Sequence, residues 1–205
     1  TLDDGVSPLP GWLTFDGSTF SGTPLNGDVG SISVMVTADD LNGGTVSDTF
    51  VLDIDNANDA PVFSGQDTGD VTEDITPLEA SGILNIVDPD ANESAFNPQT
   101  IDGYYNSILA IDVDGNWTYS ADNTHPDIQA LGINDTPLTD TFQVTSIDNT
   151  THDIVISING TNDAPTVSVE IADQTAAEDT AFSFTIPAGT FEDVDTNDTL
   201  TLTAT

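Results

Sequence analysis

The sequence predicts an all-β protein built from antiparallel β-sandwiches arranged end to end. Apolar and polar residues alternate along several short segments, which is the pattern of strands with one buried face. Turn residues separate these segments, with 16 Gly and 11 Pro in the 205-residue chain. The four residues Asn58–Pro61 recur as Asn162–Pro165 and divide the chain into three pieces. Short strands between regularly spaced turns are typical of sandwiches.

The alternation places the expected strands along the chain. They lie at residues 32–36, 50–54, 108–113, 117–119, 142–144, 154–158, 182–186 and 200–202. Asp114 and Gly115 separate two of them and predict a tight hairpin, because such a turn needs positive φ. One short helical turn is expected at residues 127–131, which does not change the fold class.

The two repeated joints predict pieces of unequal length, at residues 1–61, 62–165 and 166–205. A sandwich needs about 100 residues, so the central piece is long enough by itself and the outer pieces are not. Together, the outer pieces have about the size of one sandwich. We therefore expect residues 166–205 to be completed by residues 1–61 of a following repeat. Neighbouring repeats of a tandem chain, or identical subunits that exchange half-domains, both fit; the frequency of tandem arrays favours the first.

The charge balance excludes several partners. The chain has 36 Asp and Glu, no Lys or Arg, and a formal net charge of −36. Nucleic acid and anionic membrane surfaces should repel such a chain. No apolar run approaches the roughly 20 residues of a membrane-spanning helix, so we expect no direct membrane insertion.

The acids also point to a metal. Only His125 and His152 could become cationic side chains, so salt bridges cannot compensate most carboxylates. Backbone amides, counterions and bound cations remain. Carboxylate and carbonyl oxygens without Cys suit Ca²⁺ better than zinc or copper. Most of the acids are expected to be solvated surface, and only those at recurring positions are ligand candidates.

Specific segments resemble known families. The segments EDTAFSF, FEDVDTNDTLTLTAT, LDDGVSPLPGWLTFDG, FSGTP, VTADDLNG and SDTFVLDIDNANDAP resemble, in this order, a dystroglycan-type bacterial cadherin-like domain that is split across the chain. The central segments resemble the VCBS repeat: VTED, SGILNIVDPD, DGNWTYSADN, QALGINDT, DTFQVTSID and INGTNDAP. Both modules occur in giant, repetitive, calcium-dependent RTX-type adhesins and surface fibres of bacteria. The resemblance implies Ig/cadherin-like sandwiches in a secreted or cell-surface protein.

The same resemblance implies calcium sites at the joints, with ligands from the linker and both neighbouring domains. For the first joint, the expected ligands are Asp39, Asn58, Asp59, Glu73, Asp88 and Asp90. For the second joint, they are Asp148, Asn162, Asp163, Glu178, Asp193 and Asp195. Both Asp-x-Asp segments continue to an Asn and then an acid, Glu93 in one and Asp198 in the other. Simple polar turns are the alternative interpretation of both sets.

The functional prediction is a rigid extender of a calcium-stabilised extracellular adhesin or filament, active in adhesion or biofilm formation. The alternative is a carbohydrate-binding module that recognises surface glycans, since Trp12, Phe15 and Phe20 could stack on sugars. Catalysis is not expected. Paired carboxylates can hydrolyse glycosides, but these acids gather at joints and not around an aromatic cleft.

Overall fold

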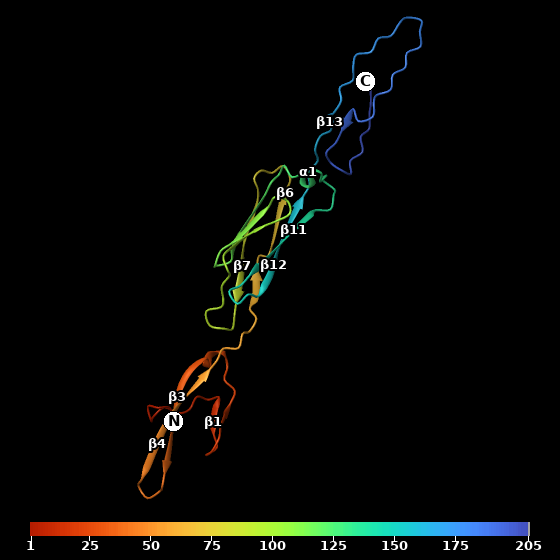
Figure 1. The fold of residues 1–205 in the computed structure, drawn as a ribbon. Helices are drawn as coiled ribbons and strands as arrows, with labels where there is room; N and C mark the ends of the chain where they lie inside the picture. The colour runs from red at the N-terminus through yellow and green to blue at the C-terminus, as the bar shows by residue number, and fades with distance from the viewer. Residues whose placement is uncertain (205) are drawn as a thin grey trace. The chain divides into compact units, whose positions relative to one another are not determined.

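The computed structural model describes residues 1–204; Thr205, the last residue of the predicted C-terminal piece, lies outside them. Strands dominate, which confirms the all-β prediction (Figure 1). The elements, in chain order, are β1 (Leu13–Phe15), β2 (Phe20–Gly22), the 3-10 turn η1 (Asn26–Asp28), β3 (Gly30–Asp39), β4 (Thr45–Ile54), β5 (Val62–Gly65), β6 (Thr68–Thr72), β7 (Leu78–Val87), β8 (Gln99–Asp102), β9 (Ile108–Ile111), β10 (Asn116–Ala121), α1 (Pro126–Gln129), β11 (Leu138–Thr145), β12 (Thr151–Asn159), β13 (Thr166–Val167) and β14 (Phe191–Glu192).

These elements fall into two compact units. The first unit holds Thr1–Val62 together with the short segment Ile86–Ala95. The second holds Phe63–Asn85 and the chain from Phe96 onward. The segment 86–95 contains the last two residues of β7 and the loop that follows, so its contacts with the first linker are contacts within one unit.

The best-packed part is a sandwich in the centre of the chain. One sheet has the strand order β5-β7-β10-β9-β8, and the other has the order β11-β12-β6. Alternate side chains of both sheets are buried between them. They include Leu84, Leu109, Trp117, Tyr119, Phe142, Ile154, Ile156 and Ile158, none more than 1% exposed. The indole Nε1 of Trp117 donates to the Gln66 carbonyl at 2.7 Å, so the largest core side chain also satisfies its polar atom.

Local turn signals in this sandwich are confirmed. Gly115 has φ +83° between β9 and β10, and a Cβ there would lie 1.9 Å from the Leu84 carbonyl oxygen. Only glycine fits that close approach. The expected helical turn is α1, with Pro126 at its first position and His125 Nδ1 accepting a hydrogen bond from the Asp127 amide at 3.3 Å.

Strand direction determines which loops lie at which end of the sandwich. β12 is antiparallel to β11 but parallel to β6, with Thr68 opposite Val155 and Thr72 opposite Asn159. The residues that follow β6 and β12 therefore lie at one end of this sheet. The β11–β12 turn lies at the other end, about 25 to 30 Å away at roughly 3.3 Å per residue.

The N-terminal piece has a smaller core. β3 and β4 form a ten-residue antiparallel ladder from the pair Gly30–Ile54 to the pair Asp39–Thr45. β1 and β2 form a second, three-residue pair. Leu13 and Val34 are the buried apolar strand side chains of this piece, and most of β4 is exposed.

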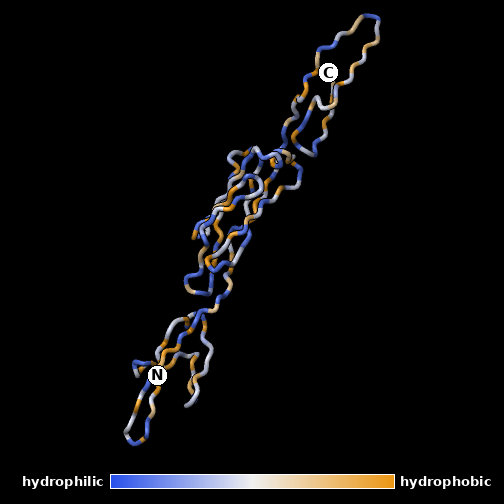
Figure 2. The backbone as a smooth tube through the Cα atoms, in the orientation of Figure 1, coloured by the Kyte–Doolittle hydropathy of each residue, from blue (hydrophilic) through white to orange (hydrophobic). Residues whose placement is uncertain are grey.

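The C-terminal piece contains one short strand pair, β13 with β14. Residues 182–186 and 200–202, which the alternation predicts as strands, carry no strand hydrogen bonding in this structure. Figure 2 shows hydrophobic positions spaced along this open segment. A strand needs a neighbouring strand for its ladder, and within residues 166–204 these two segments have none.

We predict that Ile156→Ala destabilises the central sandwich by about 2 to 5 kcal/mol, because it removes a fully buried side chain and leaves a cavity. Ile83→Ala is the matched control, since Ile83 is 51% exposed and should change stability by about 0.5 kcal/mol or less. Urea unfolding followed by fluorescence in a Trp12→Phe background isolates Trp117 as the reporter. Equal shifts for the two variants would contradict the assigned core.

Candidate metal centres

Two Asp-x-Asp turns share the same hydrogen bond between the first Asp side chain and the amide of the second Asp. In the first, Asp88 Oδ1 accepts a hydrogen bond from the Asp90 amide at 2.8 Å. In the second, Asp193 Oδ1 accepts one from the Asp195 amide at 3.1 Å. An Asp side chain that bonds the amide two residues later forms a compact turn without help from other residues. The two matching sequence segments therefore fold alike for a local reason.

Each turn also holds the linker that matches it. The Asp59 amide donates to Asp90 Oδ2 at 2.7 Å, and the Asp163 amide donates to Asp195 Oδ2 at 3.0 Å. At the first joint, Asn26 Nδ2 adds bonds to Asp59 Oδ2 at 2.8 Å and to Asp90 Oδ1 at 3.1 Å. The second Asp of each turn is therefore a fixed anchor for the recurring Asn-Asp-Ala-Pro sequence.

The linker Asn residues have a local role in this structure. Asn58 Nδ2 donates to the Asp59 carbonyl at 3.2 Å, and Asn162 Nδ2 donates to the Asp163 carbonyl at 2.5 Å. Both side chains shape the linker backbone. Within residues 1–204, neither Asn belongs to a group of acids that could hold a metal ion.

The carboxylates of these turns are buried, and burying a charged group costs free energy. Asp88 is 8% exposed, Asp90 3% and Asp195 2%. Asp88 Oδ2, Asp163 Oδ2 and Asp195 Oδ1 are buried oxygen atoms that accept no hydrogen bond in the described structure. A buried carboxylate oxygen without a donor loses its hydration and gains nothing in return. A cation bound at these turns could take these oxygens as ligands.

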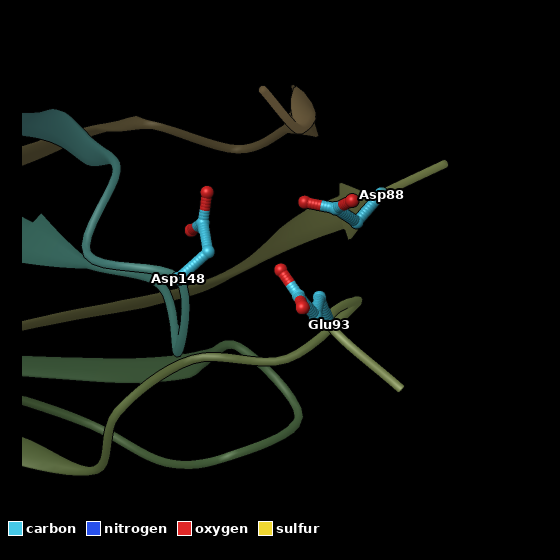
Figure 3. A group of neighbouring side chains, drawn as sticks. All are labelled: Asp88, Glu93 and Asp148. Atoms are coloured by element: carbon cyan, nitrogen blue, oxygen red, sulfur yellow. The ribbon is translucent and has the colours of Figure 1, made fainter. Parts of the chain in front are cut away.

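In each of two groups of acids, the carboxylates are close enough together to hold one ion. Asp88, Glu93 and Asp148 each offer a carboxylate oxygen, and these oxygens lie within 4.8 Å of one another (Figure 3). Asp193, Asp195 and Asp198 form the second such group. The loop that carries Asp88 and Glu93 follows β7, which ends at Val87, and leads to Phe96, which pairs with Ser146. Glu93 and Asp198 were absent from the predicted ligand sets, although both end the shared Asp-x-Asp-x-Asn-acid pattern.

Glu73 lies at the second joint, although the sequence analysis expects it at the first. It follows β6, which is parallel to β12, and its amide donates to the Asn159 carbonyl at 2.9 Å. Its carboxylate accepts bonds from Gln129 Nε2 at 3.1 Å and from the Thr161 amide at 3.3 Å. The parallel strand pair carries Glu73 to the exit of β12, where the second linker begins.

The electrostatics show that Glu73 shares its surroundings with other acids. Desolvation by burial raises the pKa of Glu73 to about 7, opposed by the Thr161 hydrogen bond and increased by Asp163, Asp74 and Asp195. Burial also raises the pKa of Asp163, with Asp74, Asp195 and Asp193 contributing repulsion. Like charges that are held together without a cation favour the protonated form.

Two other predicted ligands lie far from their expected joints. Asp39 ends β3 at the turn of the β3–β4 ladder, about 30 Å along the strands from Ile54, which leads into the first linker. Its carboxylate accepts the Leu41 amide at 2.8 Å. Asp148 sits in the β11–β12 turn, at the opposite end of the sheet from the second linker. The structure places it with Asp88 and Glu93 instead.

Glu178 is not brought to the second group. It is exposed, and only its carbonyl oxygen has a recorded contact, with the Thr180 hydroxyl at 3.5 Å. The groups that the structure assembles therefore differ from the predicted sets at Asp39, Glu73, Asp148 and Glu178. For Asp39, Glu73 and Asp148, the difference concerns which end of a sheet the loop occupies.

The comparisons with known families identify both kinds of module. A model of the bacterial cadherin-like domain matches residues 58–160. The chain belongs to this family. The family model named Putative Ig domain matches residues 1–55 and again residues 164–205. The cadherin-like match covers the central sandwich with the Asp88 turn, whereas the outer pieces match the Ig domain. A search of curated proteins gave no significant match.

We predict that the chelated chain loses stability as the pH rises from about 4.5 to above about 7. The pKa of Glu73 is raised from 4.5 to about 7 in the fold, so its contribution is fully present below the unfolded value and is lost through the folded value. Glu73→Gln should flatten this slope, because a neutral side chain does not titrate. Glu79→Gln, on exposed Glu79, should retain it. Melting temperatures in chelator at several pH values test this, and identical slopes for both variants would refute it.

Proposed function

We propose that this chain is a structural repeat of a calcium-stabilised extracellular bacterial adhesin or filament. In this role it acts as a rigid extender in adhesion or biofilm formation. The central sandwich is then a VCBS-type repeat, and the parent protein is an array of RTX type. Support comes from the family membership, from the twofold occurrence of the Asp-x-Asp turn with its linker, and from the chemistry of the turns.

The observation that carries the proposal is the pair of buried oxygens Asp88 Oδ2 and Asp195 Oδ1, which accept no hydrogen bond. They sit in turns of the same geometry, in a chain that has no Lys or Arg. His152 Nε2 lies 3.2 Å from Asp67 Oδ2, a contact that becomes an ion pair when the imidazole is protonated and that involves neither turn. Protein side chains therefore do not neutralise the turns, and a bound cation would.

Calcium fits this donor set best. All the available donors are hard oxygens, several come from carboxylates, and the chain has no Cys. Ca²⁺ accepts six to eight oxygen ligands in flexible geometry, whereas Mg²⁺ demands a smaller octahedral shell and keeps its waters. Asp88, Glu93 and Asp148 would hold one ion, and Asp193, Asp195 and Asp198 would hold another, with Asp163 available at the second linker.

Calcium at these positions would contribute to stability on the scale of a whole domain. Extracellular modules bind Ca²⁺ with dissociation constants of roughly 10⁻⁴ to 10⁻³ M. Free calcium at about 100 times the dissociation constant adds about 2.7 kcal/mol per independent site. Total domain stability is about 5 to 15 kcal/mol, so calcium bound at a few sites would decide whether a joint is rigid or flexible.

An extracellular setting agrees with the domain types. Cadherin-like and Ig-like domains are typical of extracellular or surface proteins and are usually non-enzymatic structural modules. Within residues 1–204, none of the helices has the length and apolar character needed to cross a membrane.

One observation favours the alternative, a carbohydrate-binding module. A hollow in the N-terminal piece is lined by Trp12, Phe20, Pro24, Phe50 and Leu52. Phe20 stacks on Phe15 with ring centroids 4.4 Å apart and meets Phe50 edge-on at 5.4 Å. Aromatic surfaces of this kind can stack on sugars. Titration of surface polysaccharides against Trp12 fluorescence in a Trp117→Phe background tests it, and unchanged emission excludes glycan binding at this hollow.

We predict that calcium chelation lowers the melting temperature strongly and that magnesium restores it poorly. Asp88→Asn and Asp195→Asn should each weaken calcium binding at least tenfold at one site, because each removes the buried carboxylate of its group. Asp102→Asn is the matched control, an exposed strand acid that belongs to neither group. Isothermal titration calorimetry and calorimetric melting measure the two effects.

The outcome that contradicts this prediction is specific. An unchanged melting temperature after exhaustive chelation would remove the stabilising role of calcium. Equal loss of binding for Asp88→Asn, Asp195→Asn and Asp102→Asn would show that diffuse charge, and not the two groups, attracts the ion.

A further inference from the structure

The C-terminal piece exposes a regular apolar surface that nothing in residues 166–204 covers. Phe182 and Leu202 are each 55% exposed, and Phe184, Ile186 and Leu200 are 37 to 39% exposed. They occupy alternate positions along two segments, as in a strand that buries one face. Figure 1 shows this piece mostly as a long loop without regular structure, and its strand pair is β13 with β14. Such rows of large apolar side chains mark an interaction surface.

The N-terminal piece also has an uncovered apolar surface, together with an unpaired strand edge. Its hollow, lined by Trp12, Phe20 and Phe50, is open, and Val46 and Val51 on β4 are 71% and 62% exposed. One edge of β3 pairs with β4. The other edge is met by Thr1–Asp3, through the Leu2–Val34 bridge and the bonds from Met35 N to Thr1 O and from Asp3 N to Ser33 O. The end of β3, from Val36 to Asp39, therefore presents an edge with no strand partner among the described residues.

The uncovered surfaces of the two pieces are those expected of two parts of one domain. A two-stranded ladder is marginal in water without further strands or a packed face. The Ig domain model matches both pieces, and an Ig sandwich has about seven strands in two sheets. The N-terminal piece supplies β1 to β4, and the C-terminal piece supplies β13 and the two alternating apolar segments. The β3 edge and the apolar rows are both of the kind that pairs by strand addition.

We infer that residues 166–204 of one copy and residues 1–55 of a second copy fold into one shared Ig-like sandwich. The second copy is the next repeat of the same polypeptide or a separate chain, and the physical contact is the same in both cases. The Phe182, Phe184 and Ile186 row fills the hollow of the second copy, and the segment around Leu200 and Leu202 pairs with the open edge of β3. The contact is heterologous, so it propagates from copy to copy.

The shared sandwich also completes an acid group, and this part of the inference rests on the proposed calcium function. The Asp40 turn between β3 and β4 matches the Asp148 turn between β11 and β12. Leu41 and Asn149, the residues that follow, have φ of +59° and +69°. Asp40 Oδ1 accepts the Asn42 amide at 2.8 Å, and Asp148 Oδ1 accepts the Thr150 amide at 3.1 Å.

That match assigns Asp40 a role in the second copy. In the central sandwich, the β11–β12 turn places Asp148 beside Asp88 and Glu93. Asp193 and Asp198 are the counterparts of Asp88 and Glu93, on a loop of the C-terminal piece. Asp195, beside them, is 2% exposed and has an Oδ1 atom without a donor. In the shared sandwich, Asp40 of the second copy joins Asp193 and Asp198 as Asp148 joins Asp88 and Glu93.

The test uses the whole chain with complementary surface variants. Leu200→Asp with Leu202→Asp disables the C-terminal surface, and Phe50→Asp disables the N-terminal hollow. Each variant alone should self-associate at least tenfold more weakly than the unchanged chain in sedimentation velocity. Their mixture should form a 1:1 dimer and nothing larger, because each chain retains one intact surface. Ile83→Asp, an exposed apolar position on the central sandwich, should associate like the unchanged chain.

Misfolding of a disabled piece does not affect this readout, since the dimer uses only the two intact pieces. A chain that stays monomeric at every concentration overturns the inference. A mixture without a 1:1 dimer overturns it as well. Dimers formed by a single variant alone would show a symmetric contact, which also contradicts the head-to-tail contact inferred here.

Calcium binding to the mixed dimer tests the role of Asp40. Asp40→Asn, added to the chain whose hollow is intact, should weaken one calcium site of the dimer about tenfold and leave the site of Asp88 unchanged. Asp48→Asn, on exposed Asp48 of β4, is the control. The same sedimentation run in chelator separates the two proposals. Dimers without calcium binding anywhere would refute the calcium function alone, and calcium binding at Asp88 without dimers would refute the shared sandwich alone.

Discussion

The absence of cationic side chains is the constraint on which the joints of this protein depend. In most proteins a buried Asp is compensated by Lys or Arg, and here neither exists. The Asp-x-Asp turns satisfy part of their carboxylate oxygens with backbone amides, such as those of Asp59 and Asp163. Asp88 Oδ2, Asp163 Oδ2 and Asp195 Oδ1 accept no hydrogen bond from the described residues. The same turns that hold the linker therefore leave buried carboxylate oxygens without a donor, and the proposed calcium sites would use them.

The topology of the sandwich decides which acids meet. Loops after the parallel strands β6 and β12 share one end of the sheet, so Glu73 meets Asp163 and Asp195. The β11–β12 turn is at the other end, where Asp148 meets Asp88 and Glu93. The central sandwich thus has acids at both ends, with Asp148 at one end of its sheet and Glu73 at the other.

The outer pieces illustrate the difference between a strand sequence and a strand. Phe182–Ile186 has the alternation of a half-buried strand but no ladder, whereas Phe50–Ile54 has the same alternation and pairs with β3. Pairing requires a neighbour with free backbone groups and an apolar face to cover. The central piece contains both sheets of its own sandwich, and its strands are complete. Within the described residues, no complete second sheet covers the apolar side chains of the outer pieces, and many of these side chains are exposed.

The sequence alone determined the fold class, the central strands and the local turns, because these depend on periodicity and on short-range hydrogen bonds. Residues 142–144 and 154–158 alternate and lie within β11 and β12, and Gly115 supplies the positive φ of +83° in the turn between β9 and β10. The repeated Asp-x-Asp segments were also evident, since each turn closes on its own amide. The sequence could not determine which acids converge. Glu73 and Asp148 exchanged joints because the parallel pairing of β6 with β12 is a long-range contact, and Asp39 lies a full strand length from its expected partners. Only the tertiary structure decides which end of a sandwich a loop occupies, since strand direction depends on pairing between residues far apart in the chain.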